Sequence, residues 1–370
     1  MKYYLISGEA SGDLHGANLI NALKKTDPKS EFRAWGGDLM NQAGADLVKH
    51  YKELAFMGFW EVISNLPTIL SNLKKCKKDL IQFQPDVIIY IDYPGFNLRI
   101  AKWAKSKGFL NHYYISPQVW AWKENRVQIM KQSLDALYVI LPFEKKYFEK
   151  KHQFDVDYVG HPLIDYISKH AKNETFLQNN QLEGKPIIAL LPGSRVQEIS
   201  KMLPLFISVS ERFKEYQFVI AGAPGIDSVQ YQPYLTNSSL KIVKEVTYDL
   251  LQHSSLALVT SGTATLEAAL FNVPQLVCYR TSKINYWIGK RIVKLSYISL
   301  VNLILNRFAV TELIQQNCTV SNISKELDLL LDFKRQKEMR KAYLEMKRYL
   351  GDGEASMKTA SLIYKRITKN

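Results

Sequence analysis

The segment Pro192-Gly193-Ser194-Arg195 combines residue types that suit a phosphate group. It directly follows the apolar run 187–191, and in an open parallel sheet ligands bind beyond the carboxyl ends of the strands. Gly193 and Ser194 can present main-chain amide donors there, and Arg195 can hold a phosphate through two hydrogen bonds. The same donors would stabilise negative charge on a departing diphosphate. The alternative interpretation is a surface arginine beside a turn.

Ser261-Gly262-Thr263 repeats this arrangement after the apolar run 256–260. Its hydroxyls and glycine lie where the next helix should begin, and helix N-termini favour anions. Glu267, one turn further on, could accept two hydrogen bonds from a ribose diol. We expect these residues to converge with Arg195 on one nucleotide site. Ordinary helix capping with a solvated glutamate is the alternative.

Asp92 is a candidate general base, because it ends the apolar run 87–91 and a carboxylate at that end of a parallel strand faces a ligand site. A turn aspartate that accepts hydrogen bonds from loop amides is the alternative. His15, at the start of the first expected helix, and His161, in Gly160-His161-Pro162, are rival bases. A single histidine is more often structural than catalytic.

The turn 7–13 (Ser7-Gly8-Glu9-Ala10-Ser11-Gly12-Asp13) follows the first apolar run. Its glycines allow a ligand to approach the backbone, and Ser11 and Gly12 lie where a helix N-terminus would attract an anion. The dinucleotide fingerprint Gly-x-Gly-x-x-Gly is absent. A tight turn with Asp13 as a helix cap is the alternative.

The stretch 54–73 is more apolar than one core-facing stripe requires, and Lys74, Lys75, Lys77 and Lys78 follow it. This pattern is typical of a segment that lies at the surface of an anionic membrane. A buried core helix with a solvated lysine end is the alternative. The residues expected to contact the membrane are Phe59, Trp60, Val62, Ile63, Leu66, Ile69 and Leu70.

Trp120 and Trp122, in the segment 116–122, are paired tryptophans that follow another apolar run. Near a ligand site they could line an acyl or sugar pocket. Core packing is the more frequent explanation of such a pair.

Apolar runs alternate with helical patterns along the chain, which predicts βαβ units and parallel sheets covered by helices on both faces. A polar stretch at 165–185 divides the pattern. We therefore expect an N-terminal Rossmann-like domain over 1–165, a second over 166–340 and a basic helical tail over 341–370 that packs back on the first domain. The predicted strands are 2–7, 32–35, 87–91, 111–115, 136–141, 187–191, 217–221, 256–260 and 273–278.

The composition is that of a soluble globular protein, with 46% hydrophobic and 23% charged residues among 370. Lys and Arg outnumber Asp and Glu by 49 to 35, and the net charge of +14 suits nucleic acid, an anionic membrane or phosphorylated substrates. The chain lacks a zinc pattern and an RNA-binding signature, which disfavours nucleic acid. We expect a cytoplasmic protein with reduced cysteines at 76, 278 and 318, without a signal peptide or membrane span.

In combination, these segments closely resemble the lipid-A-disaccharide synthase family. The resemblance runs in order from Ser7 to about Cys318, through segments 53–58, 91–97, 116–122, 141–144, 160–162, 190–195, 261–267 and 279–280. It implies an inverting glycosyltransferase with the two-domain GT-B fold. Such an enzyme transfers 2,3-diacylglucosamine from UDP to 2,3-diacylglucosamine 1-phosphate (lipid X), forming a β-1,6-linked disaccharide 1-phosphate in lipid A synthesis. It would work without a metal or other cofactor, peripherally on the cytoplasmic face of the inner membrane of a Gram-negative bacterium.

The resemblance also implies roles for single residues. Asp92 matches the base that acts on the acceptor hydroxyl, and Arg195 matches the arginine that holds the diphosphate. Glu267 and the segment 261–263 match the nucleotide side, with Asn302 nearby. The first domain would bind acceptor and membrane, the second the UDP-sugar. A homodimer is a further hypothesis.

Two departures from the family pattern stand out. Relatives carry a second aspartate where this chain has Gly95, which puts a shared role for two carboxylates in doubt. Relatives also lack a histidine at position 15, which weakens His15 as a base.

Two other functions fit the same residues. One is a soluble GT-B enzyme such as a UDP-GlcNAc 2-epimerase, which would have no use for the apolar stretch 56–73. The other is a peripheral membrane-binding protein with a degenerate sugar-nucleotide fold, against which the intact Asp92, Arg195 and Glu267 argue.

Overall fold

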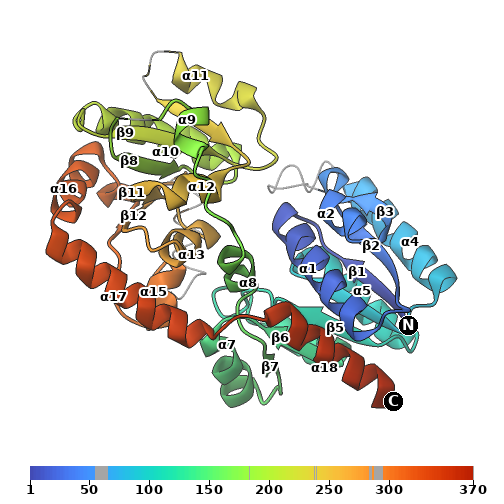
Figure 1. Ribbon diagram of the computed structural model, residues 1–370. Helices are drawn as coiled ribbons and strands as arrows, with labels where there is room; N and C mark the ends of the chain where they lie inside the picture. The colour runs from blue at the N-terminus through green and yellow to red at the C-terminus, as the bar shows by residue number, and fades with distance from the viewer. Residues whose placement is uncertain are drawn as a thin grey trace. The chain divides into compact units, whose positions relative to one another are not determined.

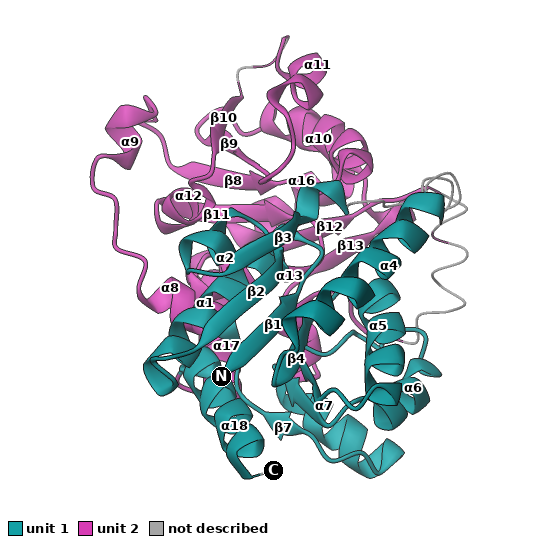
Figure 2. Cartoon of the chain, turned by 90° about the vertical axis from the view of Figure 1, so that its right-hand side faces the viewer, with its two compact units in different colours: residues 1–162, 353–370 teal, residues 163–352 magenta. Residues whose placement is uncertain are grey.

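The computed structural model describes residues 1–54, 66–182, 184–236, 238, 240–282, 286 and 295–369. The chain forms two compact units (Figure 2). Unit 1 comprises residues 1–162 and 353–370, and unit 2 comprises residues 163–352. Each unit has a parallel sheet and its own hydrophobic core.

Unit 1 contains a seven-stranded sheet in the order β3-β2-β1-β4-β5-β6-β7, and every neighbouring pair is parallel. The central strands are buried on both faces, as the continuous apolar runs predicted. The strands are β1 (Lys2–Ile6), β2 (Glu31–Gly36), β3 (Asp46–His50), β4 (Val87–Ile91), β5 (Asn111–Tyr114), β6 (Ala136–Val139) and β7 (Asp157–Tyr158).

Helices connect these strands in βαβ units (Figure 1). They are α1 (Ala10–Thr26), α2 (Asp38–Gln42), α4 (Leu66–Phe83), α5 (Pro94–Ser106), α6 (Arg126–Ser133) and α7 (Pro142–Lys146), with the 3-10 turn η1 (Tyr51–Glu53) and the π-helical turn η2 (Tyr147–Lys151).

The last helix of the chain, α18 (Ala355–Lys369), belongs to unit 1, where it packs against the first helix, α1 (Figure 1). Arg366 holds it there by pairing with Asp157 at 2.6 Å and donating to the hydroxyl of Tyr138 at 3.2 Å. Helix α17 (Phe333–Leu350) belongs to unit 2, so residues 341–370 are shared between the units.

Unit 2 contains a six-stranded parallel sheet in the order β10-β9-β8-β11-β12-β13. Its strands are β8 (Ile187–Leu191), β9 (Gln217–Gly222), β10 (Lys241–Lys244), β11 (Ser254–Val259), β12 (Gln275–Tyr279) and β13 (Glu312–Ile314). The helices of unit 2 are α8 (Pro162–Ser168), which begins at the unit boundary, α9 (Phe176–Asn179), α10 (Val196–Ser210), α11 (Gln232–Leu235), α12 (Thr247–Gln252), α13 (Thr263–Leu270), α15 (Leu300–Leu305), α16 (Val320–Leu330) and α17, with the 3-10 turns η3 (Ser228–Gln230) and η4 (Gln315–Asn317).

Both sheets place the first strand beside the fourth, which is the doubly wound Rossmann order. In such a sheet the chain moves outward in opposite directions from the first and fourth strands, which opens a crevice at their carboxyl ends. These switch points lie between β1 and β4 in unit 1 and between β8 and β11 in unit 2. The expected two Rossmann-like domains are therefore confirmed.

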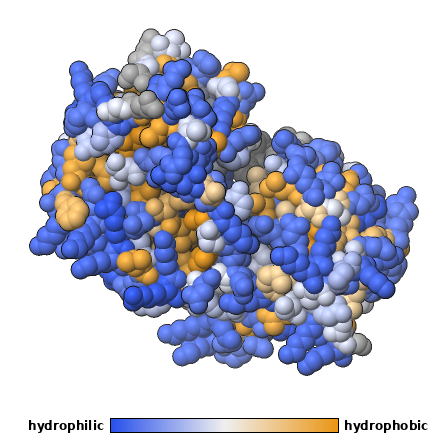
Figure 3. Space-filling view, viewed as in Figure 1, coloured by the Kyte–Doolittle hydropathy of each residue, from blue (hydrophilic) through white to orange (hydrophobic). Residues whose placement is uncertain are grey.

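Within the described residues, no helix is long and apolar enough to cross a membrane. Hydrophilic residues cover much of the face seen in Figure 3, with hydrophobic residues among them over α15 and α17. Cys76, Cys278 and Cys318 are all buried and unpaired by disulfides.

Candidate functional site

Asp92 lies at the switch point of unit 1, directly after β4. Its backbone and that of Tyr93 are left-handed, with φ of 43° and 49°. Asn97, from the first turns of α5, holds this turn by donating from Nδ2 to the main-chain oxygen of Asp92 at 2.7 Å. The hydroxyl of Tyr113 donates to the same oxygen from β5. These contacts fix the carboxyl group of Asp92 on the ligand side of the sheet.

The side chain of Asp92 is exposed, but the surrounding protein removes part of its hydration. This desolvation, together with the negative charge of Glu9, raises the pKa of the Asp92 carboxyl to about 6, although the positive charge of Arg126 opposes the shift. A carboxylate with a pKa close to neutral is better suited to take a proton than an ordinary aspartate. Asp92 therefore has the properties of a general base.

The turn after β1 packs closely against the turn that carries Asp92. A Cβ atom on Gly8 would lie 2.4 Å from the ring of Tyr93, and one on Gly12 would lie 2.8 Å from Cβ of Ser7. Side chains larger than hydrogen are therefore excluded at both positions. Ser11 is exposed at the start of α1.

Asp13 has a structural role in this turn. Its carboxylate accepts hydrogen bonds from the amides of Gly37, Leu39 and Met40, at 2.7 to 3.1 Å. It thereby anchors the start of α2 to α1.

His15 and His161 are both buried in unit 1. Burial lowers the pKa of His15 to about 4, and burial and the neighbouring His15 lower that of His161 to about 3. Both imidazoles are therefore neutral at physiological pH and weaker bases than the carboxylate of Asp92. This electrostatic difference favours Asp92 among the three rival bases.

Arg195 lies at the switch point of unit 2, between β8 and α10, and its side chain is 58% exposed. Glu198, one turn into α10, accepts a hydrogen bond from the amide of Ser194 at 3.0 Å and lies 3.6 Å from the guanidinium of Arg195. The two groups expected to hold a phosphate thus hold a carboxylate of the same chain. Gly193 is required here, because its φ is +114° and an added Cβ would lie 2.5 Å from Oε2 of Glu198.

The segment 261–263 lies on the neighbouring strand of the same switch point. β11 pairs with β8 up to Val259 and Leu191, and the amide of Thr260 still donates to the oxygen of Leu191 at 2.9 Å. Gly262 has a φ of +112° with open space around it, and α13 begins at Thr263. The structure therefore places this glycine turn and the turn of Arg195 at the ends of neighbouring strands.

Glu267 lies one turn into α13, where it is held by Tyr248. The hydroxyl of Tyr248 donates to Oε1 of Glu267 at 3.0 Å. Burial raises the pKa of the Glu267 carboxyl, and the hydrogen bond from Tyr248 partly offsets this rise. Tyr248 thus orients Glu267 and favours its ionised form.

Asn302 in α15 is fully buried, and its amide group is used within unit 2. Nδ2 donates to the oxygen of Val310 and to Glu312, while Oδ1 accepts from the amides of Ala309 and Val310. A direct contact between Asn302 and a nucleotide would require one of these bonds to be exchanged.

Trp120 and Trp122 differ in their surroundings. Trp120 is half-buried, packs edge-on against Phe143 and donates from Nε1 to the buried Glu144 at 3.0 Å, which is a structural role. Trp122 is 42% exposed and lies beside Lys123 and Arg126.

Of the residues expected to contact a membrane, Phe59, Trp60, Val62 and Ile63 lie outside the described residues, as does the side chain of Leu66. Ile69 and Leu70 lie in the first turns of α4, where Ile69 packs against the core and Leu70 is 55% exposed.

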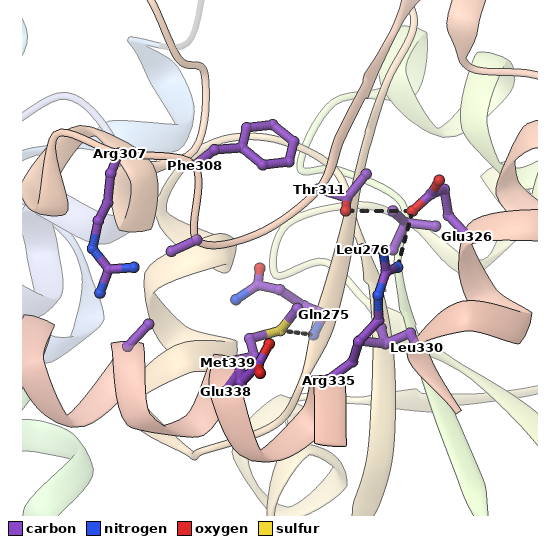
Figure 4. A pocket seen from close by; sticks show the side chains of 12 residues that line it. Gln275, Leu276, Arg307, Phe308, Thr311, Glu326, Leu330, Arg335, Glu338 and Met339 are labelled. Carbon is purple, nitrogen blue, oxygen red and sulfur yellow. Dashed lines mark hydrogen bonds and ion pairs between the residues drawn. The ribbon is translucent and has the colours of Figure 1, made fainter. Parts of the chain in front are cut away.

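A separate pocket in unit 2 lies away from the switch point. It is lined by Gln275 and Leu276, which begin β12, and by residues of α16 and α17 (Figure 4). Two of its charged groups, Arg335 and Glu326, pair with each other at 3.6 Å. Because ligands of doubly wound sheets bind at the carboxyl ends of strands, this pocket at the amino end is not the candidate site. Among the described residues, no group of His, Cys, Asp and Glu is placed to hold a metal ion.

Comparison with known proteins identifies the family to which this chain belongs. The family model described as lipid-A-disaccharide synthetase matches residues 3–367. A lipid-A-disaccharide synthase of Nitrosococcus oceani is 37% identical over 357 residues, which cover 94% of this chain and 92% of the relative. The chain belongs to the lipid-A-disaccharide synthase family. As a family member it is a glycosyltransferase that transfers a hexose, and the sequence resemblance is confirmed.

Solved structures agree with the GT-B fold expected for this family. A UDP-GlcNAc 2-epimerase of Neisseria meningitidis, solved with bound UDP-GlcNAc, superimposes with a TM-score of 0.68 at 14% identity and covers both chains fully. The calicheamicin glycosyltransferase CalG4 superimposes with a TM-score of 0.60 at 13% identity, covering 100% of this chain and 98% of that one. At such identities the likeness shows the fold alone, so the epimerase alternative gains no support over the synthase family.

Sequence reasoning overlooked several residues that position the site. Glu9 lies in the turn 7–13, where the sequence indicates no role for it, although its negative charge raises the pKa of Asp92. Tyr248 was overlooked because nothing in its spacing signals a contact with Glu267. The contact of Glu198 with Arg195 was overlooked as well. Glu198, three residues after Arg195, could have been found from helix periodicity.

Proposed function

We propose that this enzyme transfers 2,3-diacylglucosamine from its UDP donor to the 6-hydroxyl of 2,3-diacylglucosamine 1-phosphate, releasing UDP and forming a β-1,6-linked disaccharide 1-phosphate. The observation that carries this assignment is the exposed carboxyl of Asp92, at the unit 1 switch point with a pKa of about 6. In this proposal unit 1 binds the acceptor and unit 2 binds the UDP-sugar.

The chemical step we propose is a direct displacement. The acceptor hydroxyl attacks the anomeric carbon from the face opposite UDP, and Asp92 takes the hydroxyl proton as the new C–O bond forms. The bond between the anomeric carbon and the diphosphate oxygen breaks, and its electron pair leaves with UDP. Because charge develops on both oxygens, a base on one side and cations on the other lower the barrier.

On the nucleotide side, Arg195 and the amides of Gly193 and Ser194 would bind the diphosphate. The carboxylate of Glu198 now contacts the Ser194 amide and Arg195, so an arriving diphosphate would displace it. Ser261, Gly262 and Thr263 would bind the nucleotide at the start of α13, and Glu267 would accept hydrogen bonds from the ribose. Asn302 would support this side by holding the segment 309–312 in place.

On the acceptor side, Ser11 and Gly12 would line the substrate, since they lie in the turn packed beside Asp92. The apolar stretch that ends in α4 would contact the inner membrane, from which the acylated substrates are drawn. Leu70 supports this because it projects from α4 beside the exposed Lys74 and Lys75, while Leu73 and Cys76 face the core.

Mass spectrometry of the products tests the assignment. Purified protein is incubated with UDP-2,3-diacylglucosamine, with and without lipid X. We expect a disaccharide 1-phosphate and UDP only when lipid X is present, and almost none from the Asp92→Asn variant. A UDP-sugar epimerised at C2 in the absence of lipid X would overturn the proposal in favour of the epimerase.

A further inference from the structure

Lys123, in the loop between β5 and α6, and Arg126, the first residue of α6, both lie beside Trp122. Nζ of Lys123 lies 4.3 Å from the centre of the Trp122 ring, and the guanidinium carbon of Arg126 lies 5.5 Å from it. Two cations thus lie beside one partly exposed aromatic ring. Among the described residues neither cation forms an ion pair or a side-chain hydrogen bond, so both retain their donors for another group.

The acidic residue of this loop is directed elsewhere. Glu124, between the two cations in sequence, pairs with Lys151 at 2.6 Å and with His152 at 3.0 Å, and it accepts from the hydroxyl of Tyr147 at 3.2 Å. These contacts hold its carboxylate toward η2. The carboxylate of Glu124 is therefore not paired with Lys123 or Arg126, and neither cation has an acidic partner among the described residues.

The loop is also firmly held. Glu144 is buried and accepts hydrogen bonds from Nε1 of Trp120 and from the amides of Ile140 and Leu141. Tyr147 donates to the main-chain oxygen of Val119 at 3.4 Å. Because both ends of 119–124 are anchored and α6 begins at Arg126, the backbone that carries Lys123 and Arg126 is held in place, which lowers the entropic cost of binding an anion.

The cations lie in the electrostatic field of the candidate base. The charge of Arg126 lowers the pKa of Asp92, and the charge of Asp92 in turn opposes the lowering of the Arg126 pKa by burial. Burial and the positive charge of Arg126 lower the pKa of Lys123, while burial and the positive charge of Arg99 on α5 lower the pKa of Arg126. An anion bound here would relieve this repulsion close to the reacting hydroxyl.

We propose that Lys123 and Arg126 bind the phosphate group of the acceptor, with Trp122 forming one wall of this subsite. The inference rests on the proposed function, because it assigns the acceptor to unit 1. Arg126 can hold a phosphomonoester through two parallel hydrogen bonds, and Lys123 adds a third donor. The subsite would make the enzyme select phosphorylated acceptors and would orient the 6-hydroxyl toward Asp92.

Two acceptors that differ only in the phosphate test the subsite. Initial rates are measured with lipid X and with 2,3-diacylglucosamine, for the wild type and for Lys123→Ala, Arg126→Ala and Arg126→Lys. We expect Arg126→Ala to lower kcat/KM for lipid X by about 10- to 100-fold, mainly through KM, because a charge-assisted hydrogen bond is lost. The assays are run at pH 8, well above the pKa of about 6 of Asp92, so that the loss of the Arg126 charge acts little on the base. The loss with the phosphate-free acceptor should then be much smaller than that with lipid X, and Arg126→Lys should recover part of the loss with lipid X.

Lys29→Ala is the matched control, since Lys29 is an exposed lysine of the same unit in the turn before β2, at the amino end of the sheet. It removes the same charge and should affect both acceptors equally. Equal losses with the two acceptors in Arg126→Ala, or no loss with either, would overturn the proposal. Thermal unfolding of each variant separates a folding defect, which would affect both acceptors, from a lost contact.

Two further measurements distinguish this subsite from the proposed transferase function and from the binding of lipid headgroups. Equilibrium binding of lipid X and of 2,3-diacylglucosamine, followed by tryptophan fluorescence, needs no turnover. If the wild type makes no disaccharide but Arg126→Ala loses its preference for lipid X, the proposed function fails and the subsite stands. If the variants instead lose binding to vesicles of phosphatidylglycerol and keep their preference for lipid X, the cations bind lipid headgroups and the subsite proposal is wrong.

Discussion

Asn97 donates a hydrogen bond from Nδ2 to the main-chain oxygen of Asp92 at 2.7 Å and to that of Ile6 at 3.2 Å. One buried amide thus joins the carboxyl ends of β1 and β4, the two strands of the unit 1 switch point. The left-handed turn at Asp92 and Tyr93 is held by this contact, so the position of the candidate base depends on a residue of α5.

Replacement of Asp92 by asparagine should abolish proton acceptance while keeping the side-chain shape. We expect Asp92→Asn to reduce turnover by about 10²- to 10⁴-fold, the usual scale for loss of a general base, with UDP binding nearly unchanged. Steady-state kinetics and UDP titration measure the two effects. Turnover close to that of the wild type would remove Asp92 from the mechanism.

The same residue predicts a pH dependence. Because the pKa of Asp92 is raised to about 6, the base is protonated and inactive below that pH. We expect kcat/KM to fall tenfold per pH unit on the acid side, with a midpoint near pH 6. The raised pKa also means that ionisation of Asp92 opposes folding, so Asp92→Asn should be at least as stable as the wild type above pH 6. A midpoint near pH 4 would contradict the proposed environment.

An aspartate at position 95 would add a negative charge near Asp92 without a steric clash. An added Cβ would meet no atom within 4 Å, and the position lies in the first turn of α5, where an aspartate interacts favourably with the helix dipole. We expect Gly95→Asp to fold normally and to shift the acid midpoint of kcat/KM to higher pH, because a second carboxylate disfavours ionisation of Asp92. Gly95→Asn is the neutral control. An unchanged pH profile would show that position 95 does not act on Asp92.

Glu144 links pH to the stability of the loop 119–124. Burial raises its pKa to about 7, above the ordinary 4.5, so its contribution to stability is full below about pH 4.5 and is lost as the pH rises through 7. Glu144→Gln lacks this titration. The free energy of unfolding of the wild type relative to this variant should therefore fall by about 1–3 kcal/mol between pH 5 and pH 8. Urea denaturation measures it, with the partly exposed Glu149→Gln as control.

Tyr248 should affect nucleotide binding through Glu267. Tyr248→Phe removes the donor to Oε1, which leaves Glu267 less firmly oriented and raises its pKa further. We expect the Kd for UDP to increase by about 3- to 10-fold, the worth of one hydrogen bond, with a steeper loss at low pH. Isothermal titration calorimetry checks this, with Tyr166→Phe as control, since Tyr166 packs edge-on against Tyr248. Equal effects of both variants would contradict a specific role.

Leu70 tests the membrane surface. Leu70→Glu places a charge in the proposed contact, and we expect binding to anionic vesicles to weaken by about tenfold or more. Ile81→Glu makes the same change at the other end of α4, where Ile81 is 50% exposed. Vesicle sedimentation measures the binding of both variants. An equal loss of binding in the two would mean that the added charge alone causes it, and would contradict a specific contact at Leu70.

The central strands of both sheets could be predicted from the sequence, because strands buried on both faces leave continuous apolar runs such as 87–91 and 187–191. The four strands that the sequence did not reveal, β3, β7, β10 and β13, are the four edges of the two sheets. They are short and largely half-buried or exposed, so their residues lack a strong apolar pattern.

The candidate site divides in the same way. Glycine, hydroxyl and charged residues directly after apolar runs placed Asp92, Arg195 and the segment 261–263 at the carboxyl ends of strands, since local order alone determines that position. Tertiary structure alone brought Glu9 to Asp92, Tyr248 to Glu267, and α18 to α1. Such contacts depend on strand order and helix packing across long sequence separations, and no local spacing of residues encodes them.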